Sequence, residues 1–139
     1  MFLSVIIPTY WNTKEEIERC LGSIYQSDWH DFEVLLADDG NTAEYAAYLD
    51  TLPAKFSGLR ILHLPHGGES SARNGGIKAA KGEFIFLRMP MMLYRSNFVW
   101  IYRKSPRMSL PSILFTEEYK MQKWHMVKMI CVKAWSFTN

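Results

Sequence analysis

Short apolar runs alternate with polar, helix-forming segments through the first 87 residues of the chain. Because the runs are short and rich in β-branched residues, they predict buried strands of a parallel sheet. The expected strands cover residues 3–7, 32–37, 59–64 and 83–87. The segments between the strands predict helices. These expected helices begin at Thr13, span residues 42–51 and span residues 69–80.

Local signals bear on two of these helices, supporting the first and marking a special feature in the third. Thr13 is followed three residues later by Glu16, the pair that forms a capping box at a helix start. Ile17 and Leu21 then recur at helical spacing, which indicates one buried face. Gly75-Gly76 lies inside the third helix, where each glycine costs roughly 1 kcal/mol. The pair therefore indicates close packing or a bend.

This order of elements predicts one β-α-β-α-β-α-β unit with right-handed crossovers. In such α/β sheets, ligands bind outside the carboxyl ends of the strands. The segments that follow the four expected strands are Thr9-Tyr10, Asp38-Asp39, Gly67-Gly68 and residues 88–91. The sequence therefore places the candidate site at the carboxyl edge of the sheet.

The character of the chain changes after residue 87. Residues 1–87 carry seven basic and twelve acidic side chains, whereas residues 88–139 carry nine and two, so the net charges are −5 and +7. Seven of the eight methionines also lie after residue 87. Three prolines and the lack of a clean apolar period leave the fold of residues 88–139 undefined. We therefore divide the chain into an ordered part, 1–87, and an irregular C-terminal tail, 88–139.

Other features narrow the class of protein. No run of about 18 apolar residues is present, so no transmembrane helix is expected. The apolar start ends at Pro8 without a basic flank or cleavage site, so it predicts a strand rather than a signal peptide. Cys20 and Cys131 lie in different parts of the chain, and we expect reduced thiols in a cytoplasmic protein. No Cys/His cluster has zinc spacing.

The motifs of the first part resemble those of family 2 glycosyltransferases. They are SVIIPTY at 4–10, CLGSI at 20–24, Asp38-Asp39-Gly40, SARN at 71–74 and AKGEFI at 80–85. In order and spacing they are similar to the N-terminal, nucleotide-sugar-binding half of these enzymes. The resemblance covers residues 3–87 and implies a Rossmann-like GT-A half-domain, with a parallel sheet and flanking helices. It implies inverting transfer from a nucleotide-diphospho-sugar, most often a UDP-sugar, as in polysaccharide biosynthesis.

A nucleotide site is expected where the strands end. A carboxylate accepts a charge-assisted hydrogen bond from a base N3–H, so Asp38 or Asp39 is expected to read the base. The other aspartate would hold the turn or the ribose. Arg73, near the start of the third helix, is expected to reach the nucleotide, close to helix N–H groups that favour phosphate. The residues that the resemblance places along the base and ribose are Pro8, Thr9 and Tyr10.

Each of these residues also has an ordinary structural interpretation. Asp38-Asp39-Gly40 by itself is typical of a turn with a helix cap. Arg73 by itself is typical of a surface charge, and Tyr10 of a packing residue. In the family an asparagine usually follows the tyrosine directly, whereas here Trp11 comes between Tyr10 and Asn12. We therefore expect this loop to differ from the family's.

The resemblance also implies a divalent metal, Mg or Mn, bound by an Asp-x-Asp motif after the fourth strand. Such a metal neutralises the departing diphosphate. Residues 88–92 read Arg-Met-Pro-Met-Met instead, and none of these side chains is a hard oxygen ligand. The carboxylates after Glu83 are only Glu117 and Glu118, and neither matches the family's catalytic base. The chain thus shows no metal ligands, no evident cofactor and no identifiable catalytic residue.

Our hypothesis for this break is a shift of reading frame near Leu87. Methionine has one codon, so residues 89–92 are encoded ATG CCN ATG ATG. Read one base earlier, they become xAT GCC NAT GAT, which gives Asp-Ala-Asp-Asp if x and N are both G. That is a common form of the missing metal motif, at the expected place. The alternative is a genuine but divergent C-terminal segment.

The sequence therefore predicts a family 2 glycosyltransferase part that binds nucleotide weakly and transfers little or no sugar. A second hypothesis is a non-catalytic nucleotide-binding or interaction module. Its basic tail would contact a partner, a membrane surface or an anionic polymer. A receiver-like signalling domain also has paired aspartates after a strand, but it gives no role to PTY or SARN. We expect no nucleic-acid partner. Peripheral contact with the inner face of the membrane and self-association through an uncovered sheet surface are further expectations.

Overall fold

The computed structural model describes residues 3–26, 28, 30–90 and 100–103. Five strands and four helices lie in these ranges. The strands are β1 (Leu3–Thr9), β2 (Phe32–Asp38), β3 (Leu59–His63), β4 (Phe84–Leu87) and β5 (Trp100–Arg103). The helices are α1 (Lys14–Tyr25), α2 (Ala43–Leu49), α3 (Leu52–Lys55) and α4 (Glu69–Ala79).

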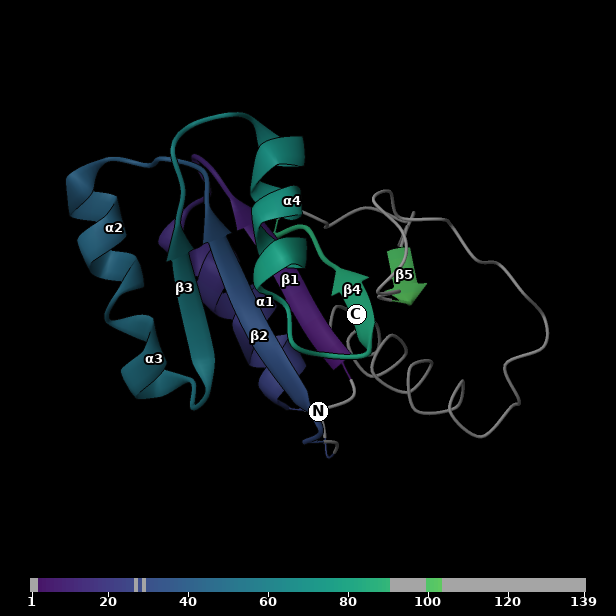
Figure 1. Cartoon of the computed structure of the whole chain (residues 1–139). Coiled ribbons are helices and arrows are strands. Elements are labelled where there is room, and N and C mark those ends of the chain that lie inside the picture. Colours follow the sequence, from purple (N-terminus) through teal and green to yellow (C-terminus); the bar gives the residue numbers. More distant parts are fainter. Residues whose placement is uncertain (1–2, 27, 29, 91–99, 104–139) are drawn as a thin grey trace.

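The strands form one sheet in the order β3-β2-β1-β4-β5 (Figure 1). The first four are parallel, as the strand–helix alternation predicted, and β5 runs antiparallel to β4. From β1 the chain proceeds to β2 and β3 on one side and then returns to place β4 on the other side. The order thus reverses at β1, and α/β sheets bind ligands in the crevice at such a switch point.

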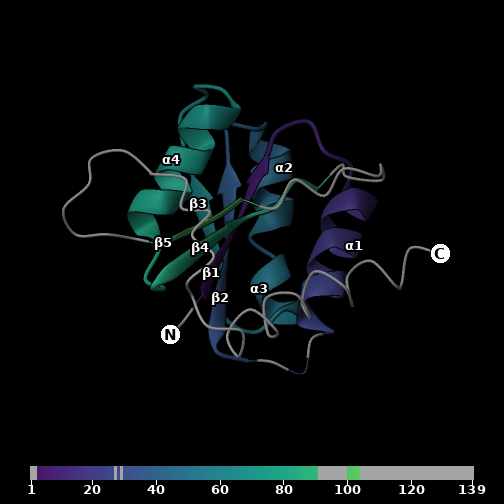
Figure 2. The same ribbon diagram turned by 90° about the vertical axis from the view of Figure 1, so that its right-hand side faces the viewer.

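Helices cover both faces of the sheet (Figure 2). On one face α1, α2 and α3 contribute to the larger core cluster, in which Ile17, Leu21 and Leu49 pack against Val5 and Leu36. On the other face, the smaller cluster packs under α4 and contains residues that alternate with the first set along the strands. Its buried members are Ile6, Leu35, Ala80, Ile85 and Leu87. This three-layer α/β arrangement confirms the predicted fold class for the front part of the chain.

Strand β1 continues through Pro8, two residues further than the apolar run predicted. Ile6 accepts a hydrogen bond from the Arg88 N–H on the β4 side, at 2.9 Å. Because strand residues alternate in direction, Pro8 faces the same side as Ile6, beyond the point where β4 ends at Leu87. The missing N–H of proline therefore costs no bond of the ladder.

Gly76 confirms that the glycine pair marks close packing rather than a bend. A Cβ atom at this position would lie 2.4 Å from Cγ2 of Ile6, which is fully buried in β1. Helix α4 can approach the sheet this closely only because the side chain is absent.

Two elements differ from the sequence prediction. The expected helix over 42–51 ends at Leu49, and a separate short helix, α3, follows with Pro53 in its first turn. Strand β5 was not predicted, and it lies within the tail. Its backbone pairs Trp100 with Leu87 and Arg103 with Phe84. Within the described ranges, no helix is long and apolar enough to cross a membrane.

Candidate functional site at the carboxyl ends of the strands

The loop after β1 is fixed by Asn12. Its Oδ1 atom accepts from the Thr9 hydroxyl at 3.1 Å and from the Tyr10 N–H at 3.2 Å. Its amide donates to Glu16 at 3.4 Å, while Glu16 and Thr13 form the predicted capping box of α1. Asn12 is buried, so the helix start and the end of β1 are connected through one shielded side chain.

Trp11 is the exposed residue of this loop. It is the sole non-glycine residue with a positive φ, 59°, among those the structure describes, and its side chain is 78% exposed. The backbone N–H of Trp11 donates to Asn41 Oδ1 at 3.1 Å. The loop therefore accommodates the additional residue between Tyr10 and Asn12 by pushing it outward, in a conformation that costs free energy for a bulky side chain.

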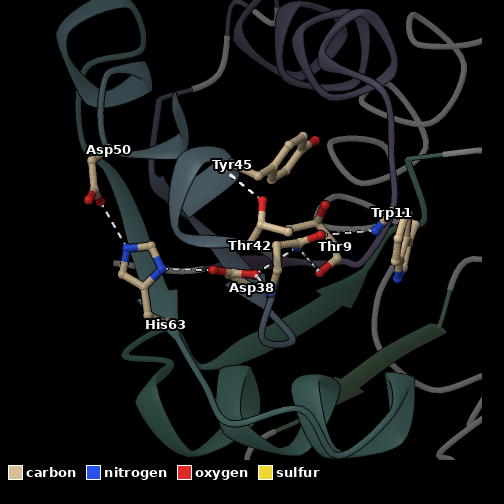
Figure 3. A network of polar contacts seen from close by, with 8 residues as sticks. Thr9, Trp11, Asp38, Thr42, Tyr45, Asp50 and His63 are labelled. Carbon is tan, nitrogen blue, oxygen red and sulfur yellow. Dashed lines mark hydrogen bonds and ion pairs between the residues drawn. The ribbon is translucent and has the colours of Figure 1, made fainter. Parts of the chain in front are cut away.

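Asp38 ends β2 with a buried carboxylate that stabilises the following turn. Its Oδ1 atom accepts from the backbone N–H and from Nδ2 of Asn41, at 3.0 and 2.7 Å. Nδ2 of Asn41 also donates to the Thr9 carbonyl at 3.2 Å, which connects the ends of β1 and β2. The second oxygen of Asp38 lies 2.8 Å from Nδ1 of His63, at the end of β3 (Figure 3). Three adjacent strand ends thus meet at Asp38.

Asp39 faces the loop after β3 instead. Its two carboxylate oxygens accept from the backbone N–H groups of Gly67 and Gly68, at 2.9 and 3.0 Å. Nδ1 of His66 lies 3.0 Å from both the carbonyl and a carboxylate oxygen of Asp39. The His66 ring in turn stacks on Tyr10, with centroids 4.4 Å apart. Asp39 is 1% exposed, and its contacts join the end of β2 to the loop after β3.

Gly40 allows the loop after β3 to lie close to the end of β2. It has φ of 73°, and a Cβ atom there would lie 2.7 Å from the backbone nitrogen of His66. Only glycine satisfies both the positive φ and the contact with the neighbouring loop.

Arg73 lies on the β4 side of the same edge. It pairs with Glu69 one turn earlier on α4, and its Nη2 atom lies 3.5 Å from the Met89 sulfur. Within the described part of the chain, no contact connects Arg73 to Asp38 or Asp39. The structure therefore brings Thr9, Tyr10 and the two aspartates together, and it places Arg73 across the switch point from them.

Among the described residues that directly follow β4, 88–90, no side chain is a hard oxygen donor. Met89 presents a thioether to Arg73, and the Arg88 guanidinium lies beside Cys20. Burial raises the pKa of the Cys20 thiol, against the smaller opposite effect of Arg88. No group of three potential metal ligands occurs in the described ranges. A thioether and a guanidinium are unsuited to Mg or Mn, so these side chains do not fit the metal that the family resemblance implies.

Comparison with known proteins identifies the family. Residues 4–87 match the model of "Glycosyl transferase family 2". The chain belongs to the family 2 glycosyltransferases. It is 36% identical to the uncharacterized glycosyltransferase EpsJ of Bacillus subtilis over 83 residues, and 34% identical to the glycosyltransferase GlyG of Streptococcus pneumoniae over 84. Each alignment covers 60% of this chain but only 24% and 28% of those relatives, so the chain spans about a quarter of their length.

Solved glycosyltransferase structures share the fold. The complex of Staphylococcus aureus TarS, residues 1–349, with UDP-GlcNAc superposes with a TM-score of 0.56 at 32% identity. It covers 65% of this chain and 26% of that one. The mannosyltransferase PcManGT of Pyrobaculum calidifontis, in complex with GDP-Man and Mn²⁺, has the same TM-score at 25% identity. That alignment covers 63% of this chain and 27% of PcManGT. These likenesses confirm the GT-A fold of the front part.

Proposed function

We propose that the carboxyl ends of β1, β2 and β3 hold the nucleoside of a nucleotide-diphospho-sugar. The observation that carries the proposal is the interlocked edge of Thr9, Asp38 and Asp39, where three strand ends and two loops converge. The TarS complexes with UDP-GlcNAc and UDP make a uridine donor the favoured class for this chain.

Each aspartate keeps acceptor capacity for a ligand. A carboxylate has about four lone-pair sites. Asp38 receives two hydrogen bonds from Asn41 and one from His63. Asp39 receives one from each of Gly67 and Gly68, and Nδ1 of His66 lies 3.0 Å from one of its oxygens. Either carboxylate therefore keeps a lone pair for the base N3–H, and the contacts already made hold it in place for that bond. Pro8, Thr9 and Tyr10 would line the base and ribose.

Arg73 is our candidate for the diphosphate. It lies on α4, across the switch point from the aspartates, and its partner Glu69 is exposed and free to turn toward water. A guanidinium binds phosphate oxygens in a two-pronged geometry. We expect Arg73→Ala to weaken the binding of UDP more than the binding of uridine, because only UDP carries the negative charge that Arg73 would contact.

The proposed activity is weak, because the groups for the chemical step are not recognisable. An intact relative would use a carboxylate base to activate the acceptor hydroxyl and a metal to stabilise the departing nucleoside diphosphate. The side chains at 88 and 89 do not fit that metal, and the two later carboxylates, Glu117 and Glu118, lie outside the described residues. We therefore propose nucleotide binding with little or no sugar transfer.

A shifted reading frame after Leu87 is our explanation for this loss. The match to the family model ends at residue 87, where the charge and methionine content change. Sequencing the encoding DNA tests it. We expect codons at Arg88 and Pro90 that both end in G, so that the shifted frame reads Asp-Ala-Asp-Asp. Any other final base at either codon argues for a genuine divergent segment.

Titration of UDP and UDP-sugars with and without Mn²⁺ tests the function. We expect measurable UDP binding that Mn²⁺ changes by less than about threefold, which is under 1 kcal/mol. We also expect no released UDP when a sugar donor and water or an acceptor are supplied. Tightening of tenfold or more by Mn²⁺, or turnover of a donor, would overturn the assignment of a missing metal site.

The charge of residues 88–139 favours a second role for that segment. Its net charge of +7 suits an anionic surface, such as the inner face of the membrane, in a cytoplasmic protein. Salt-sensitive binding to anionic vesicles is the expected result, whereas equal binding to neutral vesicles would argue against it. Sedimentation in the same buffers tests the further proposal of self-association.

A further inference from the structure

His63 lies between two carboxylates from different elements. Its Nδ1 atom is 2.8 Å from Oδ2 of Asp38, and its Nε2 atom is 2.9 Å from Oδ1 of Asp50 (Figure 3). His63 ends β3, Asp38 ends β2 and Asp50 caps the C-terminus of α2. One imidazole ring therefore connects the candidate site to a helix outside it.

The two carboxylates differ sharply in exposure. The Asp38 side chain is 3% exposed, whereas that of Asp50 is 62% exposed. Asp50 can exchange its histidine contact for water, but Asp38 cannot. Among the described residues, Oδ2 of Asp38 has His63 as its side-chain donor, so removing that donor would leave a buried carboxylate oxygen unsatisfied.

We propose that His63 is a positioning residue of the nucleotide site, whose Nδ1–H fixes the plane of the Asp38 carboxylate while Asp50 orients the ring. The proposal rests on the proposed function, since Asp38 affects binding only if the strand ends hold a nucleotide. Asn41 alone secures one oxygen of Asp38, and a carboxylate fixed at one oxygen can still rotate.

The charge state of the ring agrees with this arrangement. The hydrogen bonds with Asp38 and Asp50 raise the pKa of His63, against a smaller opposite effect of burial. The acidic groups that face the ring are these two carboxylates. When the ring loses a proton, Nδ1 keeps its hydrogen because the exposed Asp50 can turn to water. Asp38 thus remains held in both protonation states, and the contact with Asp50 is the one that is lost.

A pair of substitutions separates positioning from packing. In His63→Asn the amide nitrogen replaces Nδ1 and can still donate to Asp38, whereas in His63→Gln it replaces Nε2 and reaches toward Asp50. We expect UDP affinity within about threefold of the unmodified chain for His63→Asn, and about tenfold weaker for His63→Gln, the effect of one lost hydrogen bond to a charged group. The matched control is His30→Gln, an exposed histidine before β2, which should not change affinity. Wild-type affinity in His63→Gln, or equal losses in both variants, overturns the proposal.

An NMR titration of the His63 ring keeps this test separate from the proposed function. We expect Asp38→Asn and Asp50→Asn each to lower the pKa of His63, in chains whose spectra show that they are folded. An unchanged pKa in Asp38→Asn overturns the positioning proposal whether or not UDP binds. Failure of the unmodified chain to bind UDP, with the pKa responses intact, overturns the proposed function and leaves His63 only as a structural support of Asp38.

Discussion

At the scale of single residues, a cluster of polar side chains around the buried Glu33 lies at the amino ends of the strands, opposite the candidate site. Oε1 of Glu33 accepts from the Ser4 hydroxyl and from the Lys81 N–H, each at 2.6 Å. Oε2 accepts from Arg60 at 2.8 Å. Burial by itself would raise the pKa of Glu33, but these hydrogen bonds and the Arg60 charge outweigh it and lower the pKa. One carboxylate thus joins β1, β2, β3 and the turn before β4.

This lowered pKa predicts acid sensitivity. The contribution of Glu33 to stability is complete above its unfolded pKa of about 4.3, and it is lost as the pH falls through the lower folded value. We expect Glu33→Gln to reduce the free energy of unfolding by about 2 kcal/mol at pH 7 and to flatten its decline below pH of about 4.5. Urea unfolding between pH 3 and 7 measures both, with Glu44→Gln on the exposed start of α2 as control. If the free energy of unfolding of Glu33→Gln fell with acid as steeply as that of the unmodified chain, Glu33 would not be the group responsible for the acid sensitivity.

The sequence located the candidate site but not its internal contacts. Strand ends can be read from apolar runs, so Asp38 and Asp39 were placed correctly at the carboxyl edge. Their partners depend on loop conformations that no periodicity encodes. Asn41, His63 and His66 were therefore missed, although an asparagine after the aspartate turn and a histidine at the end of a strand were visible signals. The roles of these residues toward a nucleotide stay predictions.

At the scale of elements, α4 depends on its glycines for contact with the sheet. Gly76→Ala would place a methyl group 2.4 Å from Ile6, a buried β-branched side chain with little freedom to move. We expect a loss of about 1–3 kcal/mol in the free energy of unfolding. Gly22→Ala in α1 is the matched control, because nothing lies within 4 Å of its added methyl group. That change should stabilise the chain by about 0.5–1 kcal/mol. Equal gains in both variants would show that α4 does not pack this closely.

The predicted elements succeeded where a local signal determines them. The capping box fixes the start of α1, and both ends of α4 lie within one residue of the expected bounds. The helix over 42–51 was predicted too long. Pro53 cannot continue α2, because its ring would clash with the carbonyl four residues earlier, and it lies instead in the first turn of α3. Strand β5 escaped prediction because its pairing with β4 is a tertiary contact, and its four residues carry no alternation distinct from the surrounding tail.

At the scale of the whole molecule, the sheet separates two tasks. The amino ends of the strands carry the Glu33 cluster, which stabilises the fold. The carboxyl ends carry Asp38, Asp39, the Gly67-Gly68 loop and Trp11. The reversal of strand order at β1 places Thr9 beside the switch point, with Arg73 across it. The strand–helix alternation predicted that the candidate site lies at the carboxyl edge, but it did not predict the Glu33 cluster at the amino ends or the relation of residues 88–139 to the sheet.

The central claim is that an acidic side chain at these strand ends reads the N3–H of a uracil base. Calorimetric titration with UDP and with its N3-methylated analogue tests the claim directly, because the methyl group removes the one donor that Asp38 or Asp39 would accept. We predict that UDP binds and that the methylated analogue binds at least about tenfold more weakly, the loss of one hydrogen bond to a charged group. Equal affinity for the two compounds would contradict the account.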